Sequence, residues 1–151
     1  YEELTVGDVY EHRPGRTMTE FDNTLWTLLS QNMQPLHLDR HFAEETEFGE
    51  RLMNSMFTLS LVVGAQVSDL TMETTIANLG FGEISFPRPV FIGDTIYAET
   101  EIVEKRTSDS RDDSGVVTFK HYGKNQDGEV VCDCTRVALM KYAPEDASLE
   151  V

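Results

Sequence analysis

The segment from Asn32 to Asp39, NMQPLHLD, holds the residues best suited to acid–base chemistry. Imidazole titrates near neutral pH, so a histidine such as His37 can take a proton from water or from an activated carbon. Pro35 restricts the backbone beside it, and the amide of Asn32 can both donate to and accept from a water molecule. A histidine beside a proline is also a common structural or surface residue. A catalytic role for His37 and Asn32 is therefore a hypothesis that other residues must support.

Two other kinds of site can be weighed on spacing. His41 lies four residues after His37, but no HExxH glutamate and no third ligand accompany the pair, so we predict no metal. A Ser-His-Asp triad of Ser55 or Ser60 with His37 and Asp39 stays open, although no G-x-S-x-G turn occurs.

The apolar run from Arg51 to Leu70, RLMNSMFTLSLVVGAQVSDL, is the element most able to position a site. Its apolar residues recur at three- and four-residue steps around most of a cylinder, which predicts a buried central helix. Asn54 and Ser55 fall in its first turn, where unpaired backbone N–H groups and the helix dipole can stabilise an oxyanion. We expect the chemistry to lie at that end of the helix.

The other segments predict that helices come first and a sheet comes last. Before the central helix we expect a strand at Val9–Thr17, a helix from Thr19 to Asn32, an extended or looped Gln34–Asp39, and a short helix from Asp39 to Gly49. After it we expect strands at Thr71–Leu79, Gly82–Phe91, Ile96–Lys105, Val116–Tyr122 and Val130–Met140. This order indicates an α+β fold, with an antiparallel sheet curled around the central helix in a single domain over residues 1–151.

Four further reactive side chains lie on predicted strands. Cys132 and Cys134 are the only cysteines, and their spacing does not allow a standard disulfide within one strand. We expect them to be small buried residues in a reducing compartment. His12 and His121 are expected to be packed or surface residues.

The formal charge of −15 comes from 27 acidic and 12 basic residues. This excess argues against non-specific nucleic-acid binding, which depends on Lys and Arg. We interpret it as an acidic coat adapted to a high-salt cytoplasm. No leader sequence and no second long apolar run occur, so neither secretion nor membrane insertion is expected. The acidic tail after Pro144 is expected to fray.

Five ordered motifs extend over most of the chain: VGD at Val6–Asp8, TMTEFD at Thr17–Asp22, QPLHLD at Gln34–Asp39, TEFGERLMNSMFTLSL at Thr46–Leu61 and FPRPVFIGDTI at Phe86–Ile96. Together they resemble the MaoC-like dehydratase, or (R)-specific enoyl-CoA hydratase, family of hot-dog proteins. The resemblance implies a curled antiparallel sheet wrapped around a long central helix. It also implies an acyl-CoA substrate, at least a homodimer with sites near the interface, and no cofactor, because CoA enters as part of the substrate.

The resemblance assigns roles to the segment around His37. His37 matches the family histidine that holds the water added across the double bond. Asn32 stands where the family has an aspartate, and Gln34, assigned to substrate binding, stands where it has an asparagine. An asparagine can orient a water but cannot exchange its proton at accessible pH. Either His37 makes both proton transfers, or a carboxylate such as Glu47 or Asp39 takes part.

The resemblance also covers the predicted start of the central helix. Asn54 and Ser55 occupy the family's His-Gly positions, so the Ser55 N–H would meet the thioester oxygen, and Ser60 matches a family serine near the site. The combination is similar to the mesaconyl-CoA hydratase, or β-methylmalyl-CoA dehydratase, subgroup, which acts on short branched dicarboxylic acyl-CoAs. A substrate carboxylate needs a cationic partner. The candidates nearest the motifs are Arg40, Arg51 and Arg88.

Three functions remain as alternatives. Reversible hydration of a short branched or dicarboxylic 2-enoyl-CoA is favoured. A thioesterase is a second reading, because a water held beside a thioester can also attack its carbonyl. A non-catalytic acyl-CoA or acyl-carrier binding module is the third, and tight binding without turnover would identify it.

Overall fold

Five strands form one antiparallel sheet in the computed structural model, which describes residues 1–144. Their order is β1-β3-β4-β5-β2, and each strand is antiparallel to its neighbours. The strands are β1 (Val9–Thr17), β2 (Thr75–Ser85), β3 (Thr95–Thr107), β4 (Ser114–Lys124) and β5 (Val130–Lys141). The acidic tail after Pro144 lies outside the described residues.

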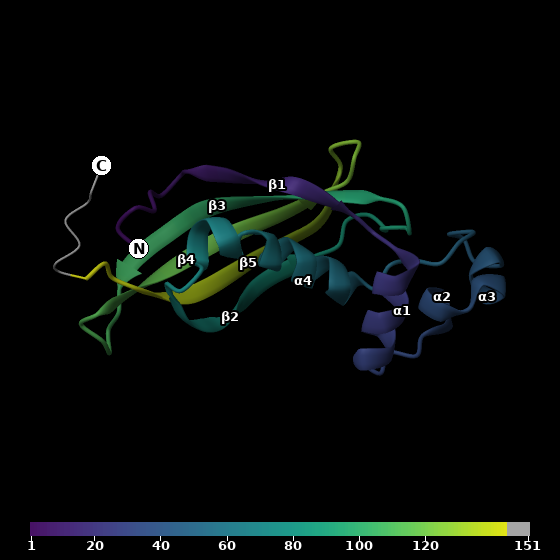
Figure 1. Ribbon diagram of the computed structural model, residues 1–151, viewed down its shortest axis with the longest axis horizontal. Helices are drawn as coiled ribbons and strands as arrows, with labels where there is room; N and C mark the ends of the chain where they lie inside the picture. Colours follow the sequence, from purple (N-terminus) through teal and green to yellow (C-terminus); the bar gives the residue numbers. More distant parts are fainter. Residues whose placement is uncertain (145–151) are drawn as a thin grey trace.

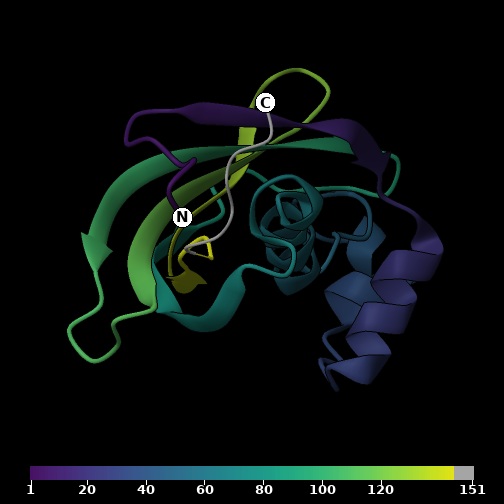
Figure 2. The ribbon, with the colours of Figure 1, turned by 60° about the vertical axis from the view of Figure 1, so that its left-hand side comes forward.

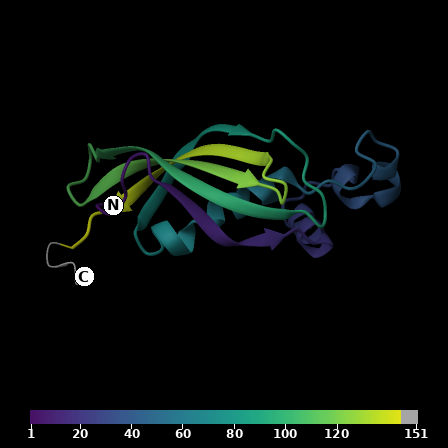
Figure 3. The same ribbon diagram turned by 90° about the horizontal axis from the view of Figure 1, so that it is seen from above.

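The sheet curls around one central helix. Figure 1 shows α4 (Ser55–Ala65) along the concave face of the sheet, and Figure 2 shows the strands bending around it. A π-helical turn, η1 (Val67–Thr71), follows α4. Three helices, α1 (Glu20–Leu29), α2 (Pro35–Leu38) and α3 (Arg40–Glu44), gather beyond the end of the sheet (Figure 3). The predicted α+β, hot-dog fold is confirmed.

The central helix begins at Ser55, so the prediction of a helix from Arg51 was wrong. Asn54 keeps an extended backbone, with φ −63° and ψ 121°, and its side chain accepts an N–H of the first turn. Leu52 instead pairs with Phe91 in an isolated β-bridge. A residue buried in a bridge is as apolar as one buried in a helix, so the spacing alone did not show where the helix starts.

The central helix is buried on one side, and not on nearly all sides as its composition suggested. Leu59 and Val62 are buried, whereas the Met56 side chain is 50% exposed. Val62 lies so close to β4 that a Cβ added to Gly123 would be 2.5 Å from its Cγ2. The absence of a side chain at Gly123 therefore lets the helix approach the sheet.

Two predicted strands, on either side of Gly80, are one strand. β2 runs from Thr75 to Ser85 without a break, and its register with β5 shifts beside Gly80, which has φ +155°. Glycine accepts this conformation and bulges absorb the shift, so the glycine bends the strand without ending it. The following residues, 86–91, lie outside the strand.

Thr19 caps α1 and Asp39 caps α3, whereas the predicted ends of the two helices were wrong. The Thr19 hydroxyl accepts from the Asp22 N–H, and the Thr19 N–H donates to the Asp22 carboxylate. Asp39 likewise accepts from the first turn of α3. The two helices end earlier than predicted, at Leu29 and Glu44.

A polar layer divides the core beneath the sheet. One apolar cluster includes Leu59 of α4, and the other includes Phe119 of β4 and packs against η1. Thr100 and His121, both fully buried, lie between the clusters on β3 and β4. The predicted burial of the two free thiols is confirmed for Cys132 and Cys134.

Candidate active site

His37 lies in a short helix, and not in the predicted loop. Pro35 takes the first position of α2, where its missing N–H and fixed φ suit the start of a helix. The His37 Nδ1 lies 3.0 Å from the carbonyl oxygen of Leu52. Because a carbonyl only accepts, Nδ1 carries the proton, and the neutral ring keeps Nε2 as its basic nitrogen. The fold therefore fixes the tautomer that a general base requires.

The start of α4 lies beside this histidine. Asn54 caps the helix, and Ser55 is its first residue, so the Ser55 N–H has no acceptor within the helix. Thr58, one turn later, is buried, and its hydroxyl has no hydrogen-bond partner among residues 1–144. The positive end of the helix dipole and these donors together suit a developing negative charge. Thr58 was not predicted, although its i+3 spacing from Ser55 places it on the same helix face.

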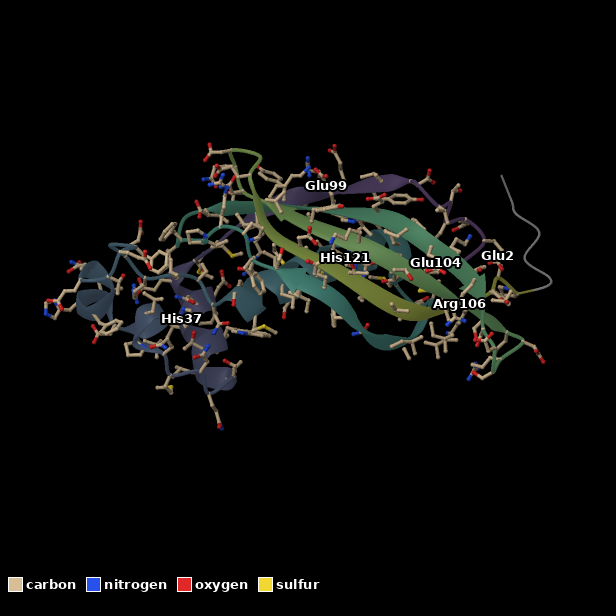
Figure 4. The ribbon with its side chains drawn as sticks, turned by 180° about the vertical axis from the view of Figure 1, so that it is seen from behind. Glu2, His37, Glu99, Glu104, Arg106 and His121 are labelled. Atoms are coloured by element: carbon tan, nitrogen blue, oxygen red, sulfur yellow. The ribbon has the colours of Figure 1, made fainter. Side chains whose placement is uncertain are left out.

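One pocket of about 350 Å³ brings three predicted residues together: His37, Ser55 and Arg88. Its volume falls in the range of small-molecule sites, and most of its wall is apolar. The other lining residues are Phe48, Leu52, Met53, Thr58, Phe86, Pro87, Pro89, Val90 and Val131. Figure 4 shows His37 among the helices at one end of the molecule.

Six predicted residues do not line this pocket: Asn32, Gln34, Asn54, Ser60, Arg40 and Arg51. The Asn32 Oδ1 accepts from the Gln34 N–H at 3.3 Å, so this side chain closes the turn before α2. The Ser60 hydroxyl donates to the Met56 carbonyl at 2.9 Å, within its own helix.

The three candidate arginines differ in their partners. Arg40 pairs with Glu44 at 2.8 Å and is 79% exposed. Arg51 is 16% exposed and pairs with Glu20 at 2.7 Å. Arg88 lies 3.4 Å from the Glu129 carboxylate, and it alone of the three lines the pocket.

The Ser-His-Asp triad that the sequence left open is not formed. The Nδ1 of His37 bonds to a backbone carbonyl, and Asp39 accepts instead from the Phe42 N–H at 3.0 Å. The Ser60 hydroxyl is engaged within α4. Among residues 1–144, no group of three His, Cys, Asp or Glu side chains is arranged to hold a metal ion.

Asn23 contacts both segments of the site, and sequence reasoning missed it. Its side chain is 1% exposed. Its Nδ2 donates to the carbonyl oxygens of His37 and Leu52, each at 3.0 Å. Its Oδ1 accepts from the Asn54 N–H at 2.9 Å. One carboxamide of α1 thus joins α2, the segment before α4, and the cap of α4.

A second histidine network lies in the polar layer of the core. The Asp69 Oδ2 lies 2.7 Å from the His12 Nδ1. The Thr100 Oγ1 lies 2.9 Å from both the His12 Nε2 and the His121 Nδ1. Asp69, His12 and Thr100 are connected as in a hydrolase triad. Thr100, however, is fully buried and does not line the pocket that contains His37. Burial, and then the charges of Arg136 and His12, lower the pKa of His121 to about 3. This network therefore belongs to the core and not to the candidate active site.

The sequence between residues 2 and 125 matches the family model described as "MaoC like domain". The chain belongs to this family. A mesaconyl-CoA hydratase of Haloarcula marismortui is 28% identical to this MaoC-like domain over 141 residues, which are 93% of the chain and 39% of the relative. The MaoC-like domain thus spans about two fifths of that relative's length.

Two solved structures are similar to the MaoC-like domain over most of both chains. The X-ray structure of a monoamine oxidase regulatory protein from Archaeoglobus has a TM-score of 0.85 and 38% identity, covering 95% of this chain and 94% of the other. An unliganded R-hydratase from Pseudomonas aeruginosa has a TM-score of 0.80 and 30% identity, and the match covers 94% of this chain and 85% of the other. Within residues 1–144, no helix is long and apolar enough to span a membrane.

Proposed function

We propose that this MaoC-like domain reversibly hydrates a 2-enoyl-CoA. The observation that carries the proposal is the pocket in which His37, with its Nδ1 proton held by Leu52, faces the same space as the start of α4. Base and oxyanion donors at one site are what addition of water to a conjugated thioester requires. The R-hydratase structure and the mesaconyl-CoA hydratase relative both support this class of reaction.

The proposed reaction uses one histidine for two proton transfers. The His37 Nε2 takes a proton from water as the water oxygen bonds to the β-carbon of the enoyl thioester. The electrons of the C=C bond move towards the thioester oxygen, where the Ser55 N–H stabilises the enolate. The imidazolium then returns its proton to the α-carbon, which completes the 3-hydroxyacyl-CoA. Neither alternative carboxylate, Asp39 or Glu47, lines the pocket, so His37 makes both transfers.

Orienting the water remains a prediction for Asn32, whose side chain lies outside the pocket. Its Oδ1 is engaged by the Gln34 N–H, which leaves the NH₂ group to donate to a water oxygen. Because Asn32 does not line the pocket, replacing it with alanine is expected to reduce turnover less than replacing His37.

A dicarboxylic acyl group is the proposed substrate class, with mesaconyl-CoA as its representative. Arg88 is the candidate arginine that lines the pocket, and its contact with Glu129 is the longest of the three arginine pairs. A planar guanidinium can bind a carboxylate through two hydrogen bonds. The similarity to a mesaconyl-CoA hydratase supports the same class.

A homodimer or larger homo-oligomer is proposed as the working form. The outer face of α1 exposes Phe21, Leu28 and Leu29 by 71%, 51% and 73%. The edge strand β2 also exposes Leu79 and Phe81, by 52% and 42%. Exposed apolar faces of this kind mark protein interfaces. Light scattering after gel filtration should give a mass of at least two chains, and a monomer at assay concentration would contradict this proposal.

The test of the proposed reaction is the ultraviolet absorbance of the conjugated thioester in high salt, with mesaconyl-CoA and crotonyl-CoA compared. We expect the absorbance band of mesaconyl-CoA to disappear with the wild-type protein and to persist with H37A. H37A that keeps most of the turnover would refute the role of His37. Release of thiol from a saturated acyl-CoA would instead identify a thioesterase, and tight binding with no change in absorbance would identify a binding module.

A further inference from the structure

Asn23 makes three side-chain hydrogen bonds, and all three join backbone groups of the candidate active site. The Nδ2 of a carboxamide carries two N–H donors. In Asn23 it lies 3.0 Å from the carbonyl oxygen of His37 and 3.0 Å from that of Leu52. The amide oxygen accepts from the Asn54 N–H at 2.9 Å. Buried polar groups are costly unless paired, so a fully buried carboxamide with three hydrogen bonds holds these three backbone groups in one arrangement.

Each bond reaches a group on which the proposed reaction depends. The bond to the His37 carbonyl fixes the backbone that carries the imidazole. The Leu52 carbonyl is also the acceptor of the His37 Nδ1 proton, so Asn23 places the group that selects the tautomer. The bond from Asn54 holds the cap of α4, which sets the direction of the first-turn N–H groups.

The geometry points to Asn23 as the positioning residue that aligns the His37 base with the oxyanion donors at the start of α4. The residue touches neither substrate nor reacting atoms in this assignment, and the inference rests on the proposed hydratase function. No isosteric residue replaces it, because aspartate lacks both donors and leucine lacks every hydrogen bond. Glutamine is longer by one methylene, which a buried site does not accommodate without rearrangement.

The test compares N23D with a control on the same helix, T27V. Aspartate preserves the size of Asn23 but turns a negative carboxylate towards two carbonyl oxygens. Thr27 is fully buried in α1 one turn later, and its hydroxyl has no hydrogen-bond partner among residues 1–144, so T27V changes the buried side of α1 without breaking a side-chain hydrogen bond to the site. We expect N23D to reduce kcat on the order of 10²-fold, with KM changed by no more than a few-fold. T27V should retain wild-type kcat.

A second measurement does not depend on turnover. Nitrogen-15 NMR of the His37 ring reports which nitrogen carries the proton, and the wild type should show the Nδ1–H form. N23D should lose this preference, and the acidic limb of its pH–rate profile should move. If N23D does not fold, N23S, which keeps one donor, should show the same changes to a smaller degree.

The outcomes separate the two proposals. Wild-type kcat and an unchanged His37 tautomer in N23D would overturn the positioning role. An equal loss of kcat in N23D and T27V, in step with loss of folded protein, would also overturn it and leave a structural role only. A wild type without turnover would refute the hydratase, while the NMR comparison would still decide whether Asn23 sets the state of His37.

Discussion

The Nδ1 of His37 is held by a backbone carbonyl and not by a carboxylate. The Leu52 oxygen holds the Nδ1 proton, but it brings no negative charge to stabilise an imidazolium. This arrangement suits a reaction in which the proton leaves the ring again in the same turnover.

The first prediction concerns the N–H of Ser55. Proline at this position removes the N–H but is compatible with the first position of a helix, and Asn54 already has the extended backbone that a residue before proline prefers. S55P is therefore expected to fold and to lower kcat by about 10²- to 10³-fold, the range for loss of one oxyanion donor. S55A, which retains the N–H, is the control. Wild-type kcat in S55P would show that another donor meets the oxygen.

The second prediction concerns the cation in the pocket. R88M should lower kcat/KM for mesaconyl-CoA by about ten- to a hundredfold, since a hydrogen bond to a charged group contributes ~1.5–3 kcal/mol. Crotonyl-CoA has no second carboxylate, so its kcat/KM should change little. R40M makes the same change of charge at an exposed position outside the pocket and serves as control. An equal loss for both substrates in R88M would contradict carboxylate recognition.

Sequence reasoning identified three of the pocket residues but missed Asn23. The motifs around His37 and Ser55 are contiguous, so their types and spacing are visible in the sequence. The partners of Asn23 lie 14, 29 and 31 residues away and are all backbone groups. Backbone groups have no signature in a sequence, so only the folded structure shows that this asparagine belongs to the site.

At the scale of elements, the contact between α4 and β4 fixes how closely the helix approaches the sheet. Gly123 permits this contact because any Cβ would lie 2.5 Å from Val62. That distance requires the helix or the strand to shift. Because Ser55 and Thr58 are on the same helix and line the pocket, such a shift would also move the proposed oxyanion donors.

The third prediction is that G123A lowers the free energy of unfolding by about 1–3 kcal/mol, the usual cost of overpacking a core. It should also lower kcat. G82A is the matched control, since a Cβ there would meet Thr135 at an ordinary 3.5 Å. Urea unfolding of the three proteins measures the difference. Equal stability of G123A and the wild type would mean that the helix and sheet are not in close contact here.

The caps of the helices were predictable, but the limits of the elements were not. Thr19 and Asp39 act locally, through N–H groups three residues away, so their roles follow from the sequence. The start of α4 depends on pairing between Leu52 and Phe91, which are far apart in the chain. A proline such as Pro35 can either end a helix or occupy its first position, and the sequence alone does not distinguish these two cases.

At the scale of the molecule, the polar layer makes stability depend on pH. His121 has a pKa lowered from 6.5 to about 3, chiefly because burial penalises its charged form. The unfolded chain therefore binds a proton at a higher pH than the folded chain does. Stability from this residue is complete above about pH 6.5 and is lost as the pH falls towards about 3.

The fourth prediction is a slope of up to about 1.4 kcal/mol per pH unit in the free energy of unfolding between about pH 6.5 and 5. Below that range, Asp22 and Asp69 add to the loss because their pKa values are also lowered, chiefly by hydrogen bonds that outweigh the desolvation of Asp22. H121Q should flatten the slope between pH 6.5 and 5. H41Q, at an exposed position of α3, should retain it. Urea titrations at several pH values measure the slope, and an unchanged slope in H121Q would contradict this assignment.

The rate at which Cys132 and Cys134 react with a thiol reagent reports how often the folded protein opens. Both thiols are buried on β5, and burial raises their pKa values to about 12 and about 11, so the folded protein presents almost no thiolate to an alkylating reagent. Modification must wait for the sheet to separate from α4, and its rate follows the population of the opened state. A single cysteine placed on the surface would consequently accept a fluorescent label with both native thiols left in place.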